Sequence, residues 1–60
     1  MTVKERVSEL REENWFVEVL CWDEDASKFI SIEPCEVEID EVVGNEMFDA
    51  VTNTATICIF

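Results

Sequence analysis

Carboxylates recur at alternate positions in the segment EPCEVEIDEVVG, residues 33–44, where single residues separate Glu36, Glu38 and Asp40. In an extended chain such alternate side chains project to the same side about every 6.6 Å, because a strand rises roughly 3.3 Å per residue. A row of carboxylates binds arginine and lysine side chains through charge-assisted hydrogen bonds. The chemistry that this pattern offers is recognition of a basic surface.

Further acids can extend this row. Glu18 lies in an apolar stretch that we expect to form a neighbouring strand, and strands in a sheet lie only about 4.8 Å apart. No Lys or Arg occurs from Phe29 to the last residue, so few bases are at hand to neutralise these acids. The predicted partner-binding residues are Glu36, Glu38, Asp40, Glu18, Asp23, Glu24 and Asp25.

The residue types for most catalytic chemistry are absent. The sequence has no histidine and one glycine, so it can build neither a Ser-His-Asp or Cys-His pair nor a glycine-rich phosphate cradle. Two carboxylates can serve in glycoside hydrolysis only inside a cleft, which so short a chain rarely encloses. The acids at 23–25 lack the glycine turn and final glutamate of an EF-hand loop. We expect no enzyme, no metal and no cofactor.

The length and charge of the chain limit its class. Sixty residues predict a single domain, 1–60, that buries only about 60% of the surface of its unfolded chain. The net charge of -11 exceeds the magnitude of about 2 to 8 that suits a small domain designed for solubility. With 48% apolar residues the chain is not a disordered acidic tail. So small a domain often gains stability from a partner chain, and a homodimer is one alternative.

Three cysteines, Cys21, Cys35 and Cys58, stand singly, and their odd number fits neither a disulfide framework nor a zinc ribbon. We interpret them as small buried hydrophobic residues in a reducing cytosol, with one redox-active or intermolecular thiol as the alternative. Charges occupy the N-terminal positions where a signal peptide is apolar, and no stretch is long enough to span a membrane. We therefore expect a cytoplasmic protein without membrane contact.

The elements that must position these residues follow from local patterns. Thr2 and Glu5 form a capping box that starts a helix ending near Asn14. The segment WFVEVLCW, residues 15–22, alternates as a strand: one face is wholly apolar, and the other carries Phe16, Glu18, Leu20 and Trp22 and is either partly covered or a contact surface. A polar loop at 23–27 leads to a second strand containing Ile30 and Ile32.

The second half is less regular. We expect Pro34 to break the chain, CEVEIDEVV to form a third strand, and Gly44 and Asn45, which permit positive φ, to form a turn. EMFDAV is expected to be a helical turn, with a continued hairpin as second choice, and TATICIF a final strand that is central, helix-covered or paired with another molecule. The predicted fold is α+β: an N-terminal helix on a three- or four-stranded antiparallel sheet, with room for a short second helix before the last strand.

A resemblance adds to this interpretation. The opening MTVKERVSELREEN, the apolar strand after it and the acidic hairpin DEDASK resemble, in size, charge and element order, short acidic proteins of phages and prophages, some of which are anti-CRISPR inhibitors. The resemblance implies a host-cell cytoplasmic protein that blocks a CRISPR effector where the PAM-containing duplex or target strand would lie. Such effectors hold nucleic acid in positively charged channels. No residue is carried over from these proteins.

Two functions follow as expectations. The first is a small acidic inhibitor, a nucleic-acid or DNA mimic that binds the basic nucleic-acid-binding site of a partner protein; four bases give no footprint for binding nucleic acid directly. The alternative is an antitoxin-like or assembly module that pairs through TATICIF or through exposed Trp22 and Phe16. A third interpretation is that the acids only keep the domain soluble.

Overall fold

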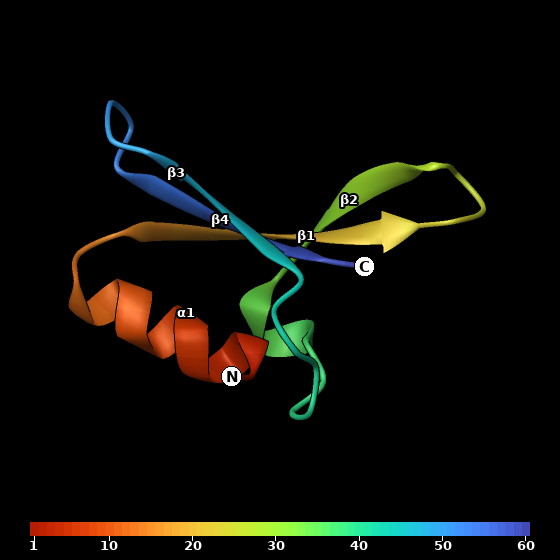
Figure 1. Cartoon of the computed structure of the whole chain (residues 1–60), viewed down its shortest axis with the longest axis horizontal. Coiled ribbons are helices and arrows are strands. Elements are labelled where there is room, and N and C mark those ends of the chain that lie inside the picture. The colour runs from red at the N-terminus through yellow and green to blue at the C-terminus, as the bar shows by residue number, and fades with distance from the viewer.

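A computed structural model describes all residues 1–60 and has an α+β fold (Figure 1). One helix packs on a four-stranded sheet whose strand order is β2-β1-β4-β3. In chain order the elements are α1 (Val3–Glu12), β1 (Phe16–Asp23), β2 (Lys28–Ile32), the 3-10 turn η1 (Pro34–Glu36), β3 (Asn45–Asp49) and β4 (Thr54–Ile59). The α+β prediction is confirmed, while the sheet is mixed and not wholly antiparallel.

The capping box at the start of α1 is formed as predicted. The Glu5 amide donates to the Thr2 hydroxyl over 3.2 Å, and the Thr2 amide donates to the Glu5 carboxylate over 3.4 Å. The bonds from Thr2 hold the pKa of the Glu5 carboxyl below its usual value. Val3, Val7 and Leu10 are the buried residues of α1, and their spacing at i, i+4 and i+7 places them on one narrow apolar stripe.

The first hairpin is also confirmed. β1 pairs antiparallel with β2, placing Val19 opposite Ile32 and Trp22 opposite Phe29. In the turn between them, the Asp23 carboxylate accepts the backbone amides of Asp25 and Ala26, and Ser27 adopts φ 52. Alternation along β1 places Val19 in the core and leaves the even-numbered side chains on the other face.

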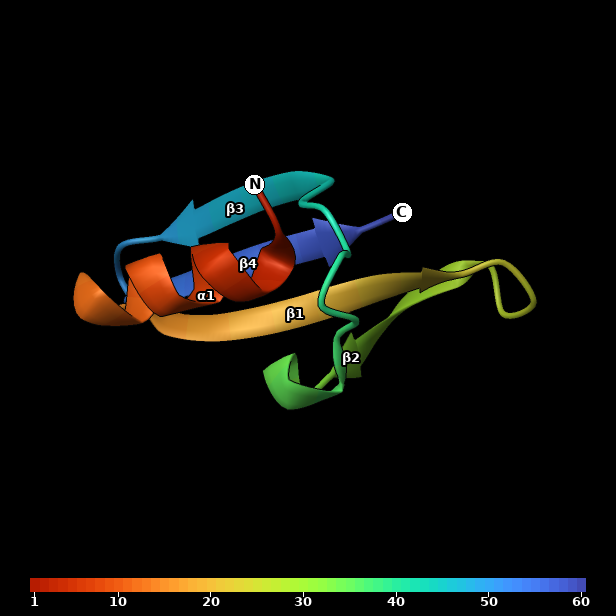
Figure 2. The ribbon, with the colours of Figure 1, turned by 90° about the horizontal axis from the view of Figure 1, so that it is seen from below.

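β4 is the inner strand that joins the two halves of the sheet. It pairs parallel with β1, where Val19 is opposite Ile57, and antiparallel with β3, where Phe48 is opposite Ala55. Of the alternatives expected for TATICIF, the central position is the one that the structure has. The expectation of a purely antiparallel sheet is wrong at the β1–β4 pair, because residues 33–44 carry the chain from β2 at one sheet edge to β3 at the other (Figure 2).

The predicted third strand does not form. Residues 33–44, which we call the crossing segment, begin with η1 and turn again where the Glu41 amide donates to the Glu38 carbonyl over 3.2 Å. Only Val37 is buried, whereas Ile39 is 79% exposed, so strand-like alternation of burial is lost. A strand here would align like charges along one side. The crossing segment instead packs beside α1, where the Val3 amide donates to the Glu41 carbonyl over 2.8 Å.

The helical turn predicted for EMFDAV is wrong, and the second choice, a hairpin, is what forms. β3 runs antiparallel to β4, and the Asp49 carboxylate starts the turn by accepting the amides of Val51 and Thr52. Asn53, with φ 56, completes it. Gly44 has no positive φ and Asn45 begins β3, so the predicted turn at these two residues is also wrong. Pairing with the apolar β4 decides the conformation over a local helical spacing.

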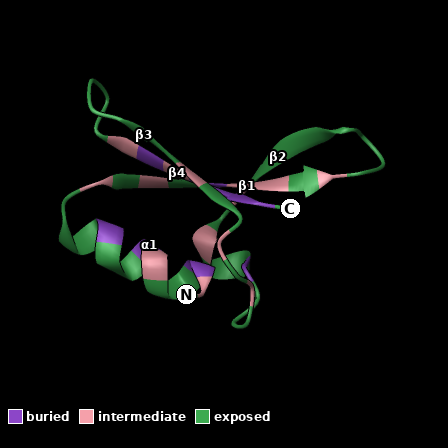
Figure 3. Cartoon of the chain, viewed as in Figure 1, coloured by how far each residue is buried: buried purple, intermediate pink, exposed green.

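The core cluster lies on one side of the sheet, and Cys58, opposite Leu20, is the one buried residue on the other side. Its buried residues come from α1, the crossing segment and the facing sides of β1 and β4: Val3, Val7, Leu10, Val19, Val37, Ala55, Ile57 and Ile59. Figure 1 shows α1 and the crossing segment on this side and no element over the opposite side of the sheet. Figure 3 shows burial concentrated between these layers, with much of the first hairpin exposed.

Candidate interaction surface

One face of the sheet has no covering layer, and we call it the open face. Paired residues of a ladder share a face, so the residues in register with even-numbered β1 positions point away from α1. The large apolar side chains of β1, β2 and β3 on this face are Phe16, Leu20, Trp22, Phe29 and Met47. The sequence left this face either partly covered or free for contact, and in the structure it is free.

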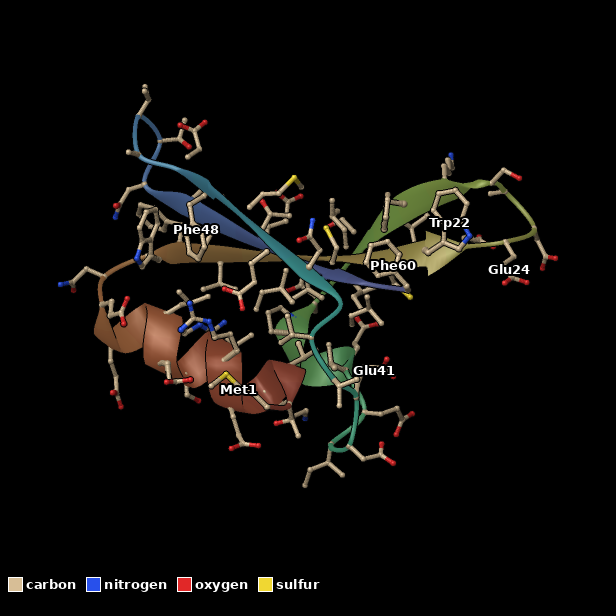
Figure 4. The ribbon with its side chains drawn as sticks, viewed as in Figure 1. Met1, Trp22, Glu24, Glu41, Phe48 and Phe60 are labelled. Atoms are coloured by element: carbon tan, nitrogen blue, oxygen red, sulfur yellow. The ribbon has the colours of Figure 1, made fainter.

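Three rings gather at one end of the open face and form what we call the aromatic cluster: Trp22, Phe29 and Phe60. The centroids of Trp22 and Phe29 lie 5.1 Å apart with planes at 70°, and those of Phe29 and Phe60 lie 5.7 Å apart at 72°. These are edge-to-face contacts, a preferred aromatic geometry. Phe60 is nevertheless 74% exposed, and Figure 4 shows Trp22 and Phe60 on the side of the ribbon away from α1.

The charges on the open face are all negative. Its ladder positions include the carboxylates of Glu18, opposite Thr56, and Asp49, opposite Thr54. Asp23 is an odd-numbered residue of β1, so its side chain lies on the face opposite the open face, and its ladder partner Lys28 shares that face. The remaining bases belong to α1. The open face therefore combines exposed aromatic surface with carboxylates and has no cation among its strand residues.

The seven predicted partner-binding acids are not brought into one row. Glu36, Glu38 and Asp40 are exposed in the crossing segment, on the same side of the sheet as α1. Asp23, Glu24 and Asp25 lie at the end of the first hairpin, and Glu18 lies on the open face. Figure 4 shows the separation, with Glu24 at the hairpin tip and Glu41 in the crossing segment. The acids would form one row only if the crossing segment were a third strand, and that strand does not form.

Most carboxylates have no cationic partner within the molecule. The one ion pair joins Arg6 of α1 to Glu46 of β3, with 2.9 Å between an Arg6 guanidinium nitrogen and Oε1. The Nε of Arg6 also donates to both Glu46 oxygens over 3.0 and 3.1 Å, which raises the pKa of Arg6. The acids of the crossing segment and of the first hairpin make no ion pair.

A cavity of about 290 Å³ lies between α1 and the start of the crossing segment. Its lining residues are Lys4, Val7, Ser8, Arg11, Glu33, Pro34 and Cys35. Lys4 and Arg11 therefore stand near Glu33, although neither forms an ion pair with it. The volume is slightly below the range of about 300–1,000 Å³ that is usual for small-molecule pockets.

Added monovalent salt is expected to stabilise the isolated protein. The net charge of -11 with a single ion pair means that like charges oppose the compact state, and salt screens this repulsion. A gain of about 1 kcal/mol would raise the melting temperature by roughly 4–8 °C for a domain of this size. Melting followed by circular dichroism in sodium chloride measures the effect; a melting temperature that falls at moderate salt would contradict this account of the charges.

The three cysteines are all free, and they differ in exposure. Cys58 is buried, as predicted, and Cys21 is half-buried against the core. Cys35 is exposed, so the prediction of a buried residue is wrong there, because Cys35 lies in η1 and not in a strand. No three His, Cys, Asp or Glu side chains come together in an arrangement suited to a metal ion. The single α-helix is too short and polar to cross a membrane.

Sequence reasoning found part of the open face. The sequence names Trp22, Phe16 and the segment TATICIF, which ends in Phe60, as interface candidates, but it does not single out Phe29. The signal for Phe29 was available, because Ile30 and Ile32 were assigned to one face and alternation assigns Phe29 to the other. The contact between Phe29 and Phe60 depends on β4 lying beside β1, which local pattern does not reveal.

Comparison with known proteins gives no assignment: no family model matches the chain, and neither the curated proteins nor the solved structures contain a match.

Proposed function

We propose that this chain is a small, non-catalytic protein-binding module that contacts its partner through the open face. The observation that carries the proposal is the aromatic cluster, whose rings pack against one another yet stay substantially exposed with no layer above them. Exposed aromatic residues are enriched at the energetic centres of interfaces. Contiguous exposed apolar surface on a small monomer commonly marks an interaction site.

The charge of the module favours a basic partner. The chain carries a net charge of -11, and unpaired acids lie on the open face, at the hairpin tip, along the crossing segment and on α1. A basic partner would be attracted from several directions, which accelerates association, while the aromatic cluster would slow dissociation. In this proposal the acids mainly accelerate the first encounter with the partner, and the rings mainly provide the binding affinity.

A second candidate is the acidic inhibitor that mimics a nucleic acid, including an inhibitor of the anti-CRISPR kind. The observation that favours it is the run of exposed acids Glu36, Glu38 and Asp40, which have no ion-pair partner. In this candidate the crossing segment, and not the open face, occupies the nucleic-acid groove of the partner. Duplex DNA should then compete for the same partner, because both would engage its arginines and lysines.

One capture experiment separates the two candidates. Wild type and three variants are immobilised. The open-face variant is Trp22→Ser/Phe60→Ser, and the glutamine variant is Glu36→Gln/Glu38→Gln/Asp40→Gln. The control is Val51→Ser, which removes an exposed apolar side chain from the β3–β4 turn. If the proposal is correct, wild type and Val51→Ser retain the same partner protein, and the open-face variant does not retain it. Retention by the open-face variant with loss by the glutamine variant would replace the proposal with the second candidate.

The glutamine variant has its own expected result. Neutralising the three acids should raise the melting temperature, because none of them takes part in an ion pair and each repels its neighbours. It should also slow association with a basic partner and flatten its salt dependence. The matched control is Glu9→Gln/Glu12→Gln/Glu13→Gln, which removes the same charge from exposed positions at the end of α1 and its C-cap. Equal slowing by both variants would show that net charge alone, and not the crossing segment, steers association.

A further inference from the structure

We infer that the occupant of the open face is a cationic amphipathic helix of a partner protein, an inference that rests on the proposed function. The fold has two layers, α1 with the crossing segment and the sheet, and the sheet presents apolar side chains on both faces. A sheet with two apolar faces is normally covered on both. A helix on the open face would complete a three-layer arrangement.

The length of the apolar row fits a helix. Phe16, Leu20 and Trp22 lie along β1 on the open face. From Phe16 to Trp22 the strand extends about 20 Å at roughly 3.3 Å per residue, which matches about 13 helical residues at 1.5 Å each, between three and four turns. Phe29 and Phe60 widen the row at the Trp22 end, where the aromatic cluster supplies the largest anchor.

The charges decide against a second copy of this chain. Two copies packed through their open faces would bring together two molecules of charge -11 and set Glu18 and Asp49 against the same acids. Glu18 interrupts the apolar row between Phe16 and Leu20, with no base in its own ladder partners. A lysine or arginine on the flank of the bound helix would pair with Glu18, so the occupant is amphipathic and basic.

The inference is tested with defined peptides and the full chain. The probe is a dye-labelled peptide of about 18 residues, or five turns, made of leucine and lysine with the leucines on one helical stripe. A scrambled peptide of the same composition keeps the charge and removes the stripe. Fluorescence anisotropy measures binding to wild type, Trp22→Ser, Phe60→Ser, Glu18→Gln and Val51→Ser, each checked for folding by circular dichroism.

We expect the striped peptide to bind wild type and Val51→Ser equally, and the scrambled peptide to bind at least about tenfold more weakly. Phe60→Ser and Trp22→Ser should each weaken binding about tenfold or more, as anchors at the centre of an interface do. Phe60 lies beyond the last strand residue, so its variant tests the inference even if Trp22→Ser unfolds. Glu18→Gln should weaken binding less and reduce its salt dependence.

Three results would overturn the inference. Equal binding of striped and scrambled peptides would mean attraction by net charge alone, and unchanged binding by Phe60→Ser would place the peptide elsewhere. A salt-promoted dimer in sedimentation that Phe60→Ser abolishes would make a second copy the occupant. If the peptides fail while the capture experiment still releases its protein from the open-face variant, the proposed function survives and only the helical occupant is rejected.

Discussion

Replacing Leu10 by Ala is expected to remove most of the stability of this protein. Leu10 is fully buried between α1 and the sheet, and deleting such a side chain costs roughly 2–5 kcal/mol. The whole domain of sixty residues is stabilised by only about 3–9 kcal/mol, at roughly 0.05–0.15 kcal/mol per residue. Urea unfolding followed by circular dichroism should give a midpoint urea concentration much lower than that of wild type. The slope of the free energy of unfolding against urea concentration should be similar.

The chain offers a matched control for this change. Leu20→Ala makes the same deletion on the open face, where the side chain is only half-buried and has no covering layer. Leu20→Ala should lower the free energy of unfolding by much less than Leu10→Ala does, because less apolar area is removed from contact and water can fill the space. Equal costs for the two variants would contradict the one-sided core.

Gly44→Ala is expected to destabilise the fold by about 1–3 kcal/mol, the usual cost of forcing extra volume into a packed site. The Gly44 amide donates to the Cys58 carbonyl over 2.9 Å, which fixes the start of β3 against the end of β4. A side-chain carbon at this position would overlap the Phe60 ring and lie 2.8 Å from the Cys58 oxygen. The ring can rotate away, but the carbonyl belongs to the backbone of the inner strand.

A double-mutant cycle separates these two contacts. Phe60→Ala alone should cost little, because the side chain is largely exposed. If the ring contributes to the clash, Gly44→Ala/Phe60→Ala should be more stable than the sum of the single changes predicts. Thermal melts supply the measurement, since about 1 kcal/mol corresponds to roughly 4–8 °C here. Strict additivity would assign the whole penalty to the Cys58 carbonyl.

The parts of the fold that sequence could predict are those with strong local signals. The capping box at Thr2 and Glu5, the alternation along residues 15–22 and the apolar final strand each correspond to an observed element. Local signals failed where neighbours decide the outcome. Residues 35–43 alternate like a strand but pack beside α1 and pair with neither edge strand of the sheet, and EMFDAV has helical spacing but pairs with β4.

The candidate site was predictable in composition and not in position. The acid excess is visible in the sequence, and the mixed character of the face with Phe16 and Trp22 was recognised. Which acids share a surface depended on the path of the crossing segment, a long-range feature. The same is true of Phe60, which reaches Phe29 only because β4 runs parallel to β1.

The position of β4 also constrains how the protein is made in the cell. Residues 54–59 are the last of these elements to leave the ribosome, yet they hold β1 and β3 together. The earlier hairpin can form during translation, but an isolated hairpin is marginally stable at best in water. Until the final strand emerges, the apolar side chains of β1 stay accessible to chaperones and to other nascent chains.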